Sequence, residues 1–313
     1  MASYLGIDTS NYTTSCALYH RGAGRVVHSK QLLPVQDGAL GLRQSDALFS
    51  HVKQLGGLME QLFSGEAGEP VRAVGVSARP RDGEGSYMPC FLAGEMAARS
   101  VGAALGVPVH LFSHQAGHVM AALYSTGRLD LVGKEFLAFH LSGGTTDCLW
   151  VRPDRERVFS ITLLASSLDL KAGQAVDRVG GMLGLPFPAG PQLDKLAAGS
   201  QAVCRQKPAF KGENCCLSGI QNICEGLWKK GTPAADVARI CLDYLCKALE
   251  QMTENALAAH PGLSLIYCGG VMSNRLIRQR IQQRFGGQFA EPQFSSDNAS
   301  GPAILASVKE EMA

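Results

Sequence analysis

Two histidines that stand four residues apart, His114 and His118, follow a short apolar segment at 107–112. Ser113 is well suited to cap a helix that starts after it, and on such a helix both rings lie on one face about a turn apart. That spacing lets them share one metal ion, provided that a third ligand comes from elsewhere in the chain. A histidine pair of this kind is, by itself, more often structural than metal-binding.

Asp297 is a candidate third ligand, because it lies in a polar segment just before a C-terminal helix. Imidazole nitrogens and an aspartate oxygen are ligand types that can share one metal ion. A capping role for Asp297 is an equally good interpretation. Asp8, at the end of an apolar segment near the N-terminus, either holds a metal-bound water or closes its own turn.

Two turns rich in serine, threonine and glycine follow apolar segments, one near Ser10 and one at 142–146. Glycine lets backbone N–H groups approach phosphate oxygens, and hydroxyl groups add donors. An ordinary hairpin explains either turn equally well when that turn is considered alone.

A second set of candidates for nucleotide binding lies further along the chain. Gly269 and Gly270 precede a helix. Their bare backbone suits the ring of a ligand, or else it only lets neighbouring elements pack closely. Asn274 is able to form a hydrogen bond with a sugar or base. Asp177, Asp194 and the loop at Gly190 are candidates to line the same cleft.

The elements that must position these residues alternate between strands and helices. The first half is predicted to run three strands, helix, strand, helix, strand, helix, and a strand–turn–strand unit begins again at 136–150. Thr13-Thr14-Ser15-Cys16 is echoed by Thr145-Thr146-Asp147-Cys148, which indicates two related α/β halves. The segment 207–231 is expected to be irregular, and a long helix is expected at 234–260.

Composition narrows the possible classes of protein. The 313 residues are 46% hydrophobic, enough for a large core in two domains. The net charge of +2 neither requires nor excludes nucleic acid as a partner. The arginines at 275, 278, 280 and 284, with those at 79 and 81, form either a modest basic surface or a solvated face.

No apolar segment reaches membrane-spanning length, so we expect a cytoplasmic protein without a membrane partner. The ten cysteines are expected to be reduced thiols, and for the cluster at 204–224 metal binding is the weaker alternative.

Taken together, these motifs resemble the universal tRNA threonylcarbamoyladenosine synthase family, formerly described as glycoproteases or O-sialoglycoprotein endopeptidases. The resemblance covers nearly the whole chain in the same order. The family's Gly-Ile-Glu-Thr-Ser, His-x-Glu-Gly-His and Ser-Gly-Gly-His-Thr segments are similar to residues 6–10, 114–118 and 142–146. Its Asp-Lys segment with Pro-Gly-Gly-Pro, its Gly-Gly-Val-x-x-Asn and its Thr-Asp-Asn-Gly-Ala are similar to residues 177–191, 269–274 and 296–300.

The resemblance implies a duplicated two-lobe α/β fold like that of actin, the heat-shock ATPases and sugar kinases, with nucleotide and metal in the interlobe cleft. We expect an N-terminal lobe at 1–130, on which a C-terminal helix of about 298–313 packs, and a C-terminal lobe at 131–297. The implied metal ligands are His114, His118 and Asp297, and the implied catalytic residues are Asp8, Ser10 and Thr13. The residues implied to bind nucleotide and substrate are His140, Leu141, Ser142, Gly143, Gly144, Thr145, Asp177, Gly190, Asp194, Gly269, Gly270 and Asn274.

The implied reaction transfers a threonylcarbamoyl or carbamoyl group from its adenylate to the N6 amine of the tRNA adenosine next to the anticodon. One iron or zinc ion would act as a Lewis acid and template. ATP or an acyl-adenylate would be the nucleotide substrate, with Mg²⁺ as a candidate companion. The implied partners are tRNA, a smaller paralogous subunit and an ATPase.

This chain departs from the family pattern at several positions. Asn11 and Tyr12 are among the residues that replace Cys-Asp-Glu-Thr after the Thr-Ser turn, Ala116 replaces the glutamate between the histidines, and Thr145 replaces a histidine. A divergent, non-catalytic ATP-binding paralogue that acts as a partner or regulator is therefore the alternative. A metallohydrolase is the third reading, weakened because no glutamate follows the first histidine to serve as a general base.

Overall fold

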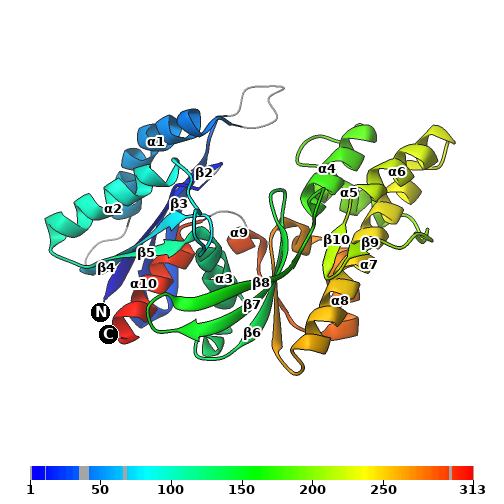
Figure 1. The fold of residues 1–313 in the computed structure, drawn as a ribbon. Helices are drawn as coiled ribbons and strands as arrows, with labels where there is room; N and C mark the ends of the chain where they lie inside the picture. The colour runs from blue at the N-terminus through cyan, green and yellow to red at the C-terminus, as the bar shows by residue number, and fades with distance from the viewer. Residues whose placement is uncertain (1, 11, 35–41, 66–68, 296–297, 313) are drawn as a thin grey trace. The chain divides into compact units, whose positions relative to one another are not determined.

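The computed structural model describes residues 2–10, 12–34, 42–65, 69–295 and 298–312, and the chain divides into two compact units (Figure 1). Unit 1 comprises Met1–Val132, Pro153–Ser160 and Ser296–Ala313, and unit 2 comprises Gly133–Arg152 and Ile161–Ser295. Within the described ranges, no helix is long and apolar enough to cross a membrane.

Unit 1 contains a mixed sheet with the strand order β3-β2-β1-β4-β5. Its strands are β1 (Ser3–Asp8), β2 (Thr13–His20), β3 (Arg25–Leu32), β4 (Val71–Arg79) and β5 (Val109–Ser113). The helices of this unit are α1 (Gln44–Ser64), α2 (Phe91–Leu105), α3 (His114–Ser125) and α10 (Ser300–Met312), with the 3-10 helices η1 (Arg21–Ala23) and η2 (Leu129–Leu131). The predicted order of three strands, helix, strand, helix, strand, helix is confirmed.

Unit 2 is built around a second sheet, with the order β12-β11-β6-β7-β8. Its strands are β6 (Phe136–Leu141), β7 (Thr146–Asp154), β8 (Val158–Ser166), β11 (Ser264–Cys268) and β12 (Gln288–Phe289), and a separate hairpin comprises β9 (Ala209–Lys211) and β10 (Asn214–Cys216). The helices are α4 (Ala172–Met182), α5 (Gly190–Ala197), α6 (Gly219–Lys229), α7 (Ala234–Ala259), η3 (Gly270–Ser273), α8 (Arg275–Phe285) and α9 (Pro292–Ser295).

The two sheets follow one plan, which confirms the duplicated α/β fold. In unit 1, β1 is antiparallel to β2 and parallel to β4, and β4 is parallel to β5. In unit 2, β6 is antiparallel to β7 and parallel to β11, and β11 is parallel to β12. The echo between residues 13–16 and 145–148 therefore reflects equivalent hairpins in the two sheets.

The expectation that residues 207–231 are irregular is wrong. This segment contains the β9–β10 hairpin and helix α6. Ile220 and Cys224 of α6 are buried, and Ile223 and Leu227 pack against the same core, so the apolar residues recur at helical spacing. The cysteines and glycines around them conceal this period in the sequence. All ten cysteines are free, as predicted, and only Cys216 is not fully buried.

Glycines in two strands bring helix α10, drawn in red in Figure 1, directly onto the sheet of unit 1. A Cβ atom on Gly6 of β1 would lie 2.1 Å from the carbonyl oxygen of Ala299. A Cβ atom on Gly75 of β4 would lie 2.0 Å from the carbonyl oxygen of Pro302. Because real Cβ atoms do not approach backbone so closely, any larger residue would push the start of α10 away.

A similar contact joins α10 to α3. A Cβ atom on Gly301 would lie 2.0 Å from the carbonyl oxygen of Gly117. Gly117 lies between the two histidines of the candidate metal site, so the beginning of α10 is fixed beside them.

We predict that replacing Gly75 with alanine destabilises unit 1 by about 1–3 kcal/mol, because the new methyl group overlaps the backbone of α10. Gly56→Ala is the matched control, since a Cβ atom there meets nothing within 4 Å on an exposed face of α1. The control should leave stability unchanged or raise it by up to about 1 kcal/mol. Urea denaturation followed by circular dichroism measures both variants, and equal midpoints would contradict the packing described here.

Candidate functional site

The first candidate metal ligand of unit 1 and the residues that contact it or its partner gather at the carboxyl ends of three adjacent parallel strands. Asp8 is the last residue of β1, Ser77 lies near the end of β4, and His114 follows β5 directly. The strand order β1-β4-β5 places these ends side by side at one edge of the sheet. In open α/β sheets this edge is the usual location of ligand sites.

Asp8 is buried, with 1% of its surface exposed, and its carboxylate is surrounded by hydrogen-bond donors. Oδ1 accepts hydrogen bonds from the backbone N–H of Ser10, at 2.8 Å, and from the hydroxyl group of Ser10. Oδ2 accepts from the hydroxyl group of Ser77 at 2.5 Å and from Nδ1–H of His114 at 2.8 Å. Asp8 thus closes its own turn, as one of the two interpretations held, and also fixes the first histidine.

The same contacts set the charge of this carboxylate. Burial by itself would raise the pKa of Asp8, but the nearby charge of His114 and the hydrogen bonds from His114, Ser10 and Ser77 hold the pKa below its ordinary value. A buried carboxylate is tolerated only with such partners. Asp8 is therefore an ionised acceptor whose position is determined by its surroundings.

Helix α3 presents His114 and His118 together, as their spacing predicts. The ring centroids lie 4.3 Å apart in an edge-to-face arrangement. Ser113 caps the helix as predicted, because its hydroxyl oxygen accepts a hydrogen bond from the N–H of Ala116 at 3.2 Å. The imidazole of His114 keeps 19% of its side-chain surface exposed beside the buried Asp8.

The third candidate ligand, Asp297, lies outside the described residues, as does Asn11. Asn298 follows it, and its side-chain oxygen accepts a hydrogen bond from the N–H of Ser300 at 3.1 Å, at the start of α10. Among the residues that the structure describes, no three His, Cys, Asp or Glu side chains are grouped to hold a metal ion. The two histidines nevertheless fit such an ion chemically, because a metal-binding histidine usually donates its other ring N–H to a carboxylate.

The other candidate catalytic residues line the same turn. Ser10 is 1% exposed and bonded to Asp8, while Thr13 begins β2, is 6% exposed, and donates its backbone N–H to the carbonyl oxygen of Ser10 at 3.3 Å. Thr9 fixes the turn to α2, since its hydroxyl oxygen accepts from the N–H of Gly94 at 3.1 Å. Sequence reasoning missed Ser77, whose role depends entirely on the pairing of β4 with β1.

In unit 2 the candidate phosphate turn, residues 142–145, lies on the N-terminus of α4. The N–H of Gly173 donates to the carbonyl oxygen of Ser142 at 3.0 Å, and a Cβ atom on Gly173 would lie 2.6 Å from the backbone N of Gly143. Within the turn, the hydroxyl oxygen of Ser142 accepts from the N–H of Thr145 at 3.1 Å. Gly143 and Gly144 are exposed and have open space beside them, which leaves room for an anion near their backbone N–H groups.

The second glycine pair of unit 2 lies against the strand that precedes this turn. Gly269 has a φ of +96°, and a Cβ atom there would lie 2.2 Å from the carbonyl oxygen of Leu141 and 2.9 Å from the ring of His140. Only glycine adopts this positive φ readily and also lacks the Cβ atom that would overlap these neighbours. Gly270 is exposed at the start of η3. The structure therefore brings together two predicted segments that are far apart in the sequence.

The polar candidates of unit 2 all have partners within the protein. Asp177 accepts from the N–H of Ala189 at 2.9 Å, next to Gly190, and burial raises its pKa despite that hydrogen bond. Asp194 accepts from Nε–H of Arg275 at 2.9 Å. The side-chain oxygen of Asn274 accepts from the N–H of Ile277 at 3.1 Å and so caps α8. These residues hold together the elements around the two glycine segments.

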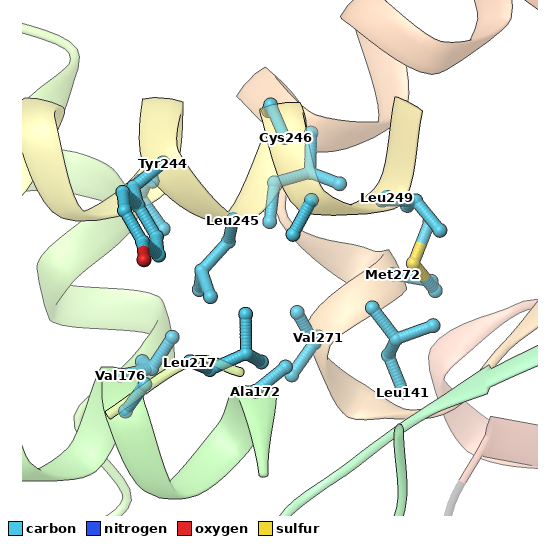
Figure 2. Packing of buried hydrophobic residues seen from close by; sticks show 14 of the residues in the cluster. Leu141, Ala172, Val176, Leu217, Tyr244, Leu245, Cys246, Leu249, Val271 and Met272 are labelled. Atoms are coloured by element: carbon cyan, nitrogen blue, oxygen red, sulfur yellow. The ribbon is translucent and has the colours of Figure 1, made fainter. Parts of the chain in front are cut away.

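A single apolar cluster supports these segments from behind. Figure 2 shows side chains of α7, including Leu245 and Leu249, packed over residues from the start of α4, from η3 and from the end of β6. Ala172, Val271 and Leu141 are the buried contacts that these three elements contribute. The candidate phosphate turn and the glycine pair are thus fixed by one core.

Acidic side chains neutralise most of the α8 arginines that one of the two interpretations assigned to a basic surface. Arg280 makes two hydrogen bonds of 2.7 Å to Glu250 and is also bonded to Asp243; the bonds to Glu250 are the main reason that its pKa is raised. Arg284 is paired with Glu254, and Arg275 with Asp194 as described above. The interpretation as a solvated face, held by ion pairs, is therefore the better one.

Comparison with known proteins gives consistent matches over most of the chain. The family model described as "TsaD: tRNA N6-adenosine threonylcarbamoyltransferase" matches residues 41–303. A tRNA N6-adenosine threonylcarbamoyltransferase from Pyrobaculum calidifontis is 29% identical over 300 residues, which cover 95% of this chain and 83% of the relative. Another protein of that name, from Aromatoleum aromaticum, is 29% identical over 329 residues, which cover 97% of this chain and 90% of the relative.

Solved structures match the fold at much lower identity. Component A of (R)-2-hydroxyglutaryl-CoA dehydratase from Acidaminococcus fermentans has a TM-score of 0.56 at 16% identity, covering 100% of this chain and 99% of that chain. A ROK family glucokinase from Streptomyces griseus has a TM-score of 0.53 at 12% identity, and the match covers 98% of this chain and 99% of that chain. HypF of T. kodakarensis has a TM-score of 0.62 at 11% identity, and the match covers 99% of this chain and 47% of that chain. These likenesses confirm the actin-like and sugar-kinase-like fold class.

We predict that Gly173→Ala displaces the turn at 142–145, because the new methyl group would overlap the backbone of Gly143. Amide exchange of Gly143, Gly144 and Thr145 should be faster in this variant. Gly181→Ala, on the same helix but with nothing within 4 Å of its Cβ position, is the control. Hydrogen–deuterium exchange measures both, and unchanged protection of the turn in Gly173→Ala would show that α4 does not support it.

Proposed function

The chain belongs to the TsaD family of tRNA N6-adenosine threonylcarbamoyltransferases and is therefore a transferase enzyme, and we propose that it modifies an adenosine of tRNA. The proposed substrates are threonylcarbamoyl adenylate and the adenosine next to the anticodon. The observation that carries the proposal is the histidine pair of α3, set against a buried carboxylate, in a chain that matches this family over residues 41–303.

In the proposed reaction the N6 amine of adenosine attacks the carbamoyl carbon of the adenylate. A new carbon–nitrogen bond forms, the bond from that carbon to the phosphate oxygen breaks, and AMP and one proton are released. The protein's main contribution is to orient the two reactants, because holding them in a reactive geometry removes much of the entropic part of the barrier.

His114, His118 and Asp297 are the proposed ligands of one zinc or iron ion. Bound there, such an ion would supply Lewis-acid polarisation of the reacting carbonyl and charge stabilisation on the phosphate. The packing of Gly301 against Gly117 supports this assignment, because it fixes the described residues just after Asp297 beside the helix that carries both histidines.

The nucleotide part of the substrate is proposed to bind in unit 2. The exposed backbone at Gly143 and Gly144 is suited to phosphate, and the exposed Gly270 is suited to a flat ring. Asp177, Asp194 and Asn274 would act mainly by holding the surrounding elements, because each already accepts a hydrogen bond within the protein. His140, Leu141, Ser142, Thr145 and Gly190 complete the proposed group, with ATP and Mg²⁺ as the alternative occupants.

tRNA, a smaller paralogous subunit and an ATPase remain proposed partners. The family relationship supports tRNA as the acceptor. The arginines of α8 are not proposed as its contact surface, because acidic residues neutralise most of them.

Mass spectrometry of nucleosides from tRNA tests the proposal. Wild-type protein, zinc or iron, and threonylcarbamoyl adenylate should yield threonylcarbamoyladenosine, and His114→Ala should lower the yield by at least about a hundredfold, as expected when a catalytic metal loses a ligand. His110→Ala is the matched control, since His110 lies on β5 and pairs with Glu310 instead.

The assay is run with the isolated chain and again with the smaller paralogue and the ATPase present. Product that forms only with these partners would still support the proposal. Absence of product in both arms, with nucleotide and metal still bound, would contradict it and favour a non-catalytic paralogue.

A further inference from the structure

Asp8 lies directly behind the first candidate metal ligand, with its carboxylate against the imidazole of His114. We propose that Asp8 is a positioning residue: its carboxylate orients His114 and fixes the ring tautomer, so that Nε2 is the atom that binds metal. This inference rests on the proposed function in one respect, namely that His114 is a ligand of the proposed zinc or iron ion.

The charge of the Asp8 carboxylate determines the direction of its hydrogen bond with His114. An ionised carboxylate only accepts, so Nδ1 of His114 must carry the proton in the 2.8 Å contact with Oδ2. In a neutral imidazole, a proton on Nδ1 leaves the lone pair on Nε2. The carboxylate therefore selects the tautomer in which the far nitrogen is able to bind a metal ion.

The carboxylate of Asp8 is itself held rigidly. Its other oxygen accepts from the N–H and hydroxyl groups of Ser10, and Ser77 donates to the same oxygen as His114. Ser10 and Ser77 are both buried, at 1% and 0% exposure. Asp8 therefore has one well-defined orientation, and its hydrogen bond to Nδ1 fixes the orientation of the His114 imidazole.

Burial distinguishes the positioning role of Asp8 from a direct part in the chemistry. Asp8 is 1% exposed, and both of its oxygens are occupied by protein donors. A carboxylate in that state is poorly placed to receive a proton from a substrate. It acts on the reaction through His114, which keeps 19% of its side-chain surface exposed.

Asp8→Asn is the discriminating variant, because asparagine has the same shape but one end becomes a donor. The N–H of Ser10 can only donate, so the amide oxygen should remain on that side and the amide NH₂ should face His114. Nδ1 must then accept, and the proton moves to Nε2, where it blocks metal binding. A role confined to packing would leave the tautomer unchanged.

The test uses the full-length chain and Zn²⁺ alone. Competition with a chelator measures the dissociation constant, and long-range ¹H–¹⁵N NMR of the metal-free protein, at a pH where the ring is neutral, reports the tautomer of His114. Asp8→Asn should weaken Zn²⁺ binding by about 10–100-fold and convert His114 to the Nε2–H form. Asp46→Asn, in the first turn of α1, is the control and should change neither property.

Ser77→Ala provides a second variant should Asp8→Asn fold poorly. It keeps the carboxylate but removes one of its donors, so Zn²⁺ should bind more weakly than to the wild type and more tightly than to Asp8→Asn, with the tautomer of His114 unchanged. Wild-type affinity in both folded variants would overturn the positioning role.

The failures of the two proposals are distinguishable. If His114→Ala abolishes Zn²⁺ binding while Asp8→Asn retains it with the wild-type tautomer, the metal site stands and the positioning role is wrong. If both variants lose Zn²⁺ but the wild type makes no modified tRNA, the positioning role stands and the proposed function is wrong. If His114→Ala binds Zn²⁺ normally, both are overturned.

Discussion

The close approach of α10 to β1, β4 and α3 is the constraint on which the candidate site of unit 1 depends. Gly6 and Gly75 let the backbone at the start of α10 lie where a side chain would otherwise stand, and Gly301 of α10 does the same for the backbone of α3 at Gly117. The C-terminal segment thereby reaches the strand that ends in Asp8 and the helix that carries both histidines. A ligand set drawn from both ends of the chain requires this packing, since none of the elements brings the residues together alone.

In the candidate site of unit 1, the charge of Asp8 determines how the side chains around it are arranged. Burying the carboxylate of Asp8 would be costly without compensation, and the serines and His114 supply it. In unit 2, by contrast, the apolar face of α7 packs against the start of α4, η3 and the end of β6, which flank the candidate phosphate turn and the glycine pair (Figure 2). Electrostatic compensation thus positions His114, whereas hydrophobic packing positions the candidate phosphate turn and the glycine pair.

Local patterns in the sequence predicted much of this arrangement. The apolar periodicity identified the strands and helices of unit 1, and Ser113 with the histidine spacing identified α3. The contact between Asp8 and His114 joins residues 106 positions apart, and it follows from the strand order β1-β4-β5, which periodicity does not encode. For the same reason the acidic partners of the α8 arginines, which lie on α5 and α7, were invisible in the sequence, and so was the role of Ser77.

X-ray absorption spectroscopy at the zinc edge, on protein loaded with one equivalent of Zn²⁺, tests the central claim most directly. We predict two imidazole nitrogens and carboxylate oxygen at about 2.0–2.2 Å from the metal, with no sulfur. Sulfur at about 2.3 Å would place the metal among the cysteines instead. That result would contradict a metal centre built on His114 and His118.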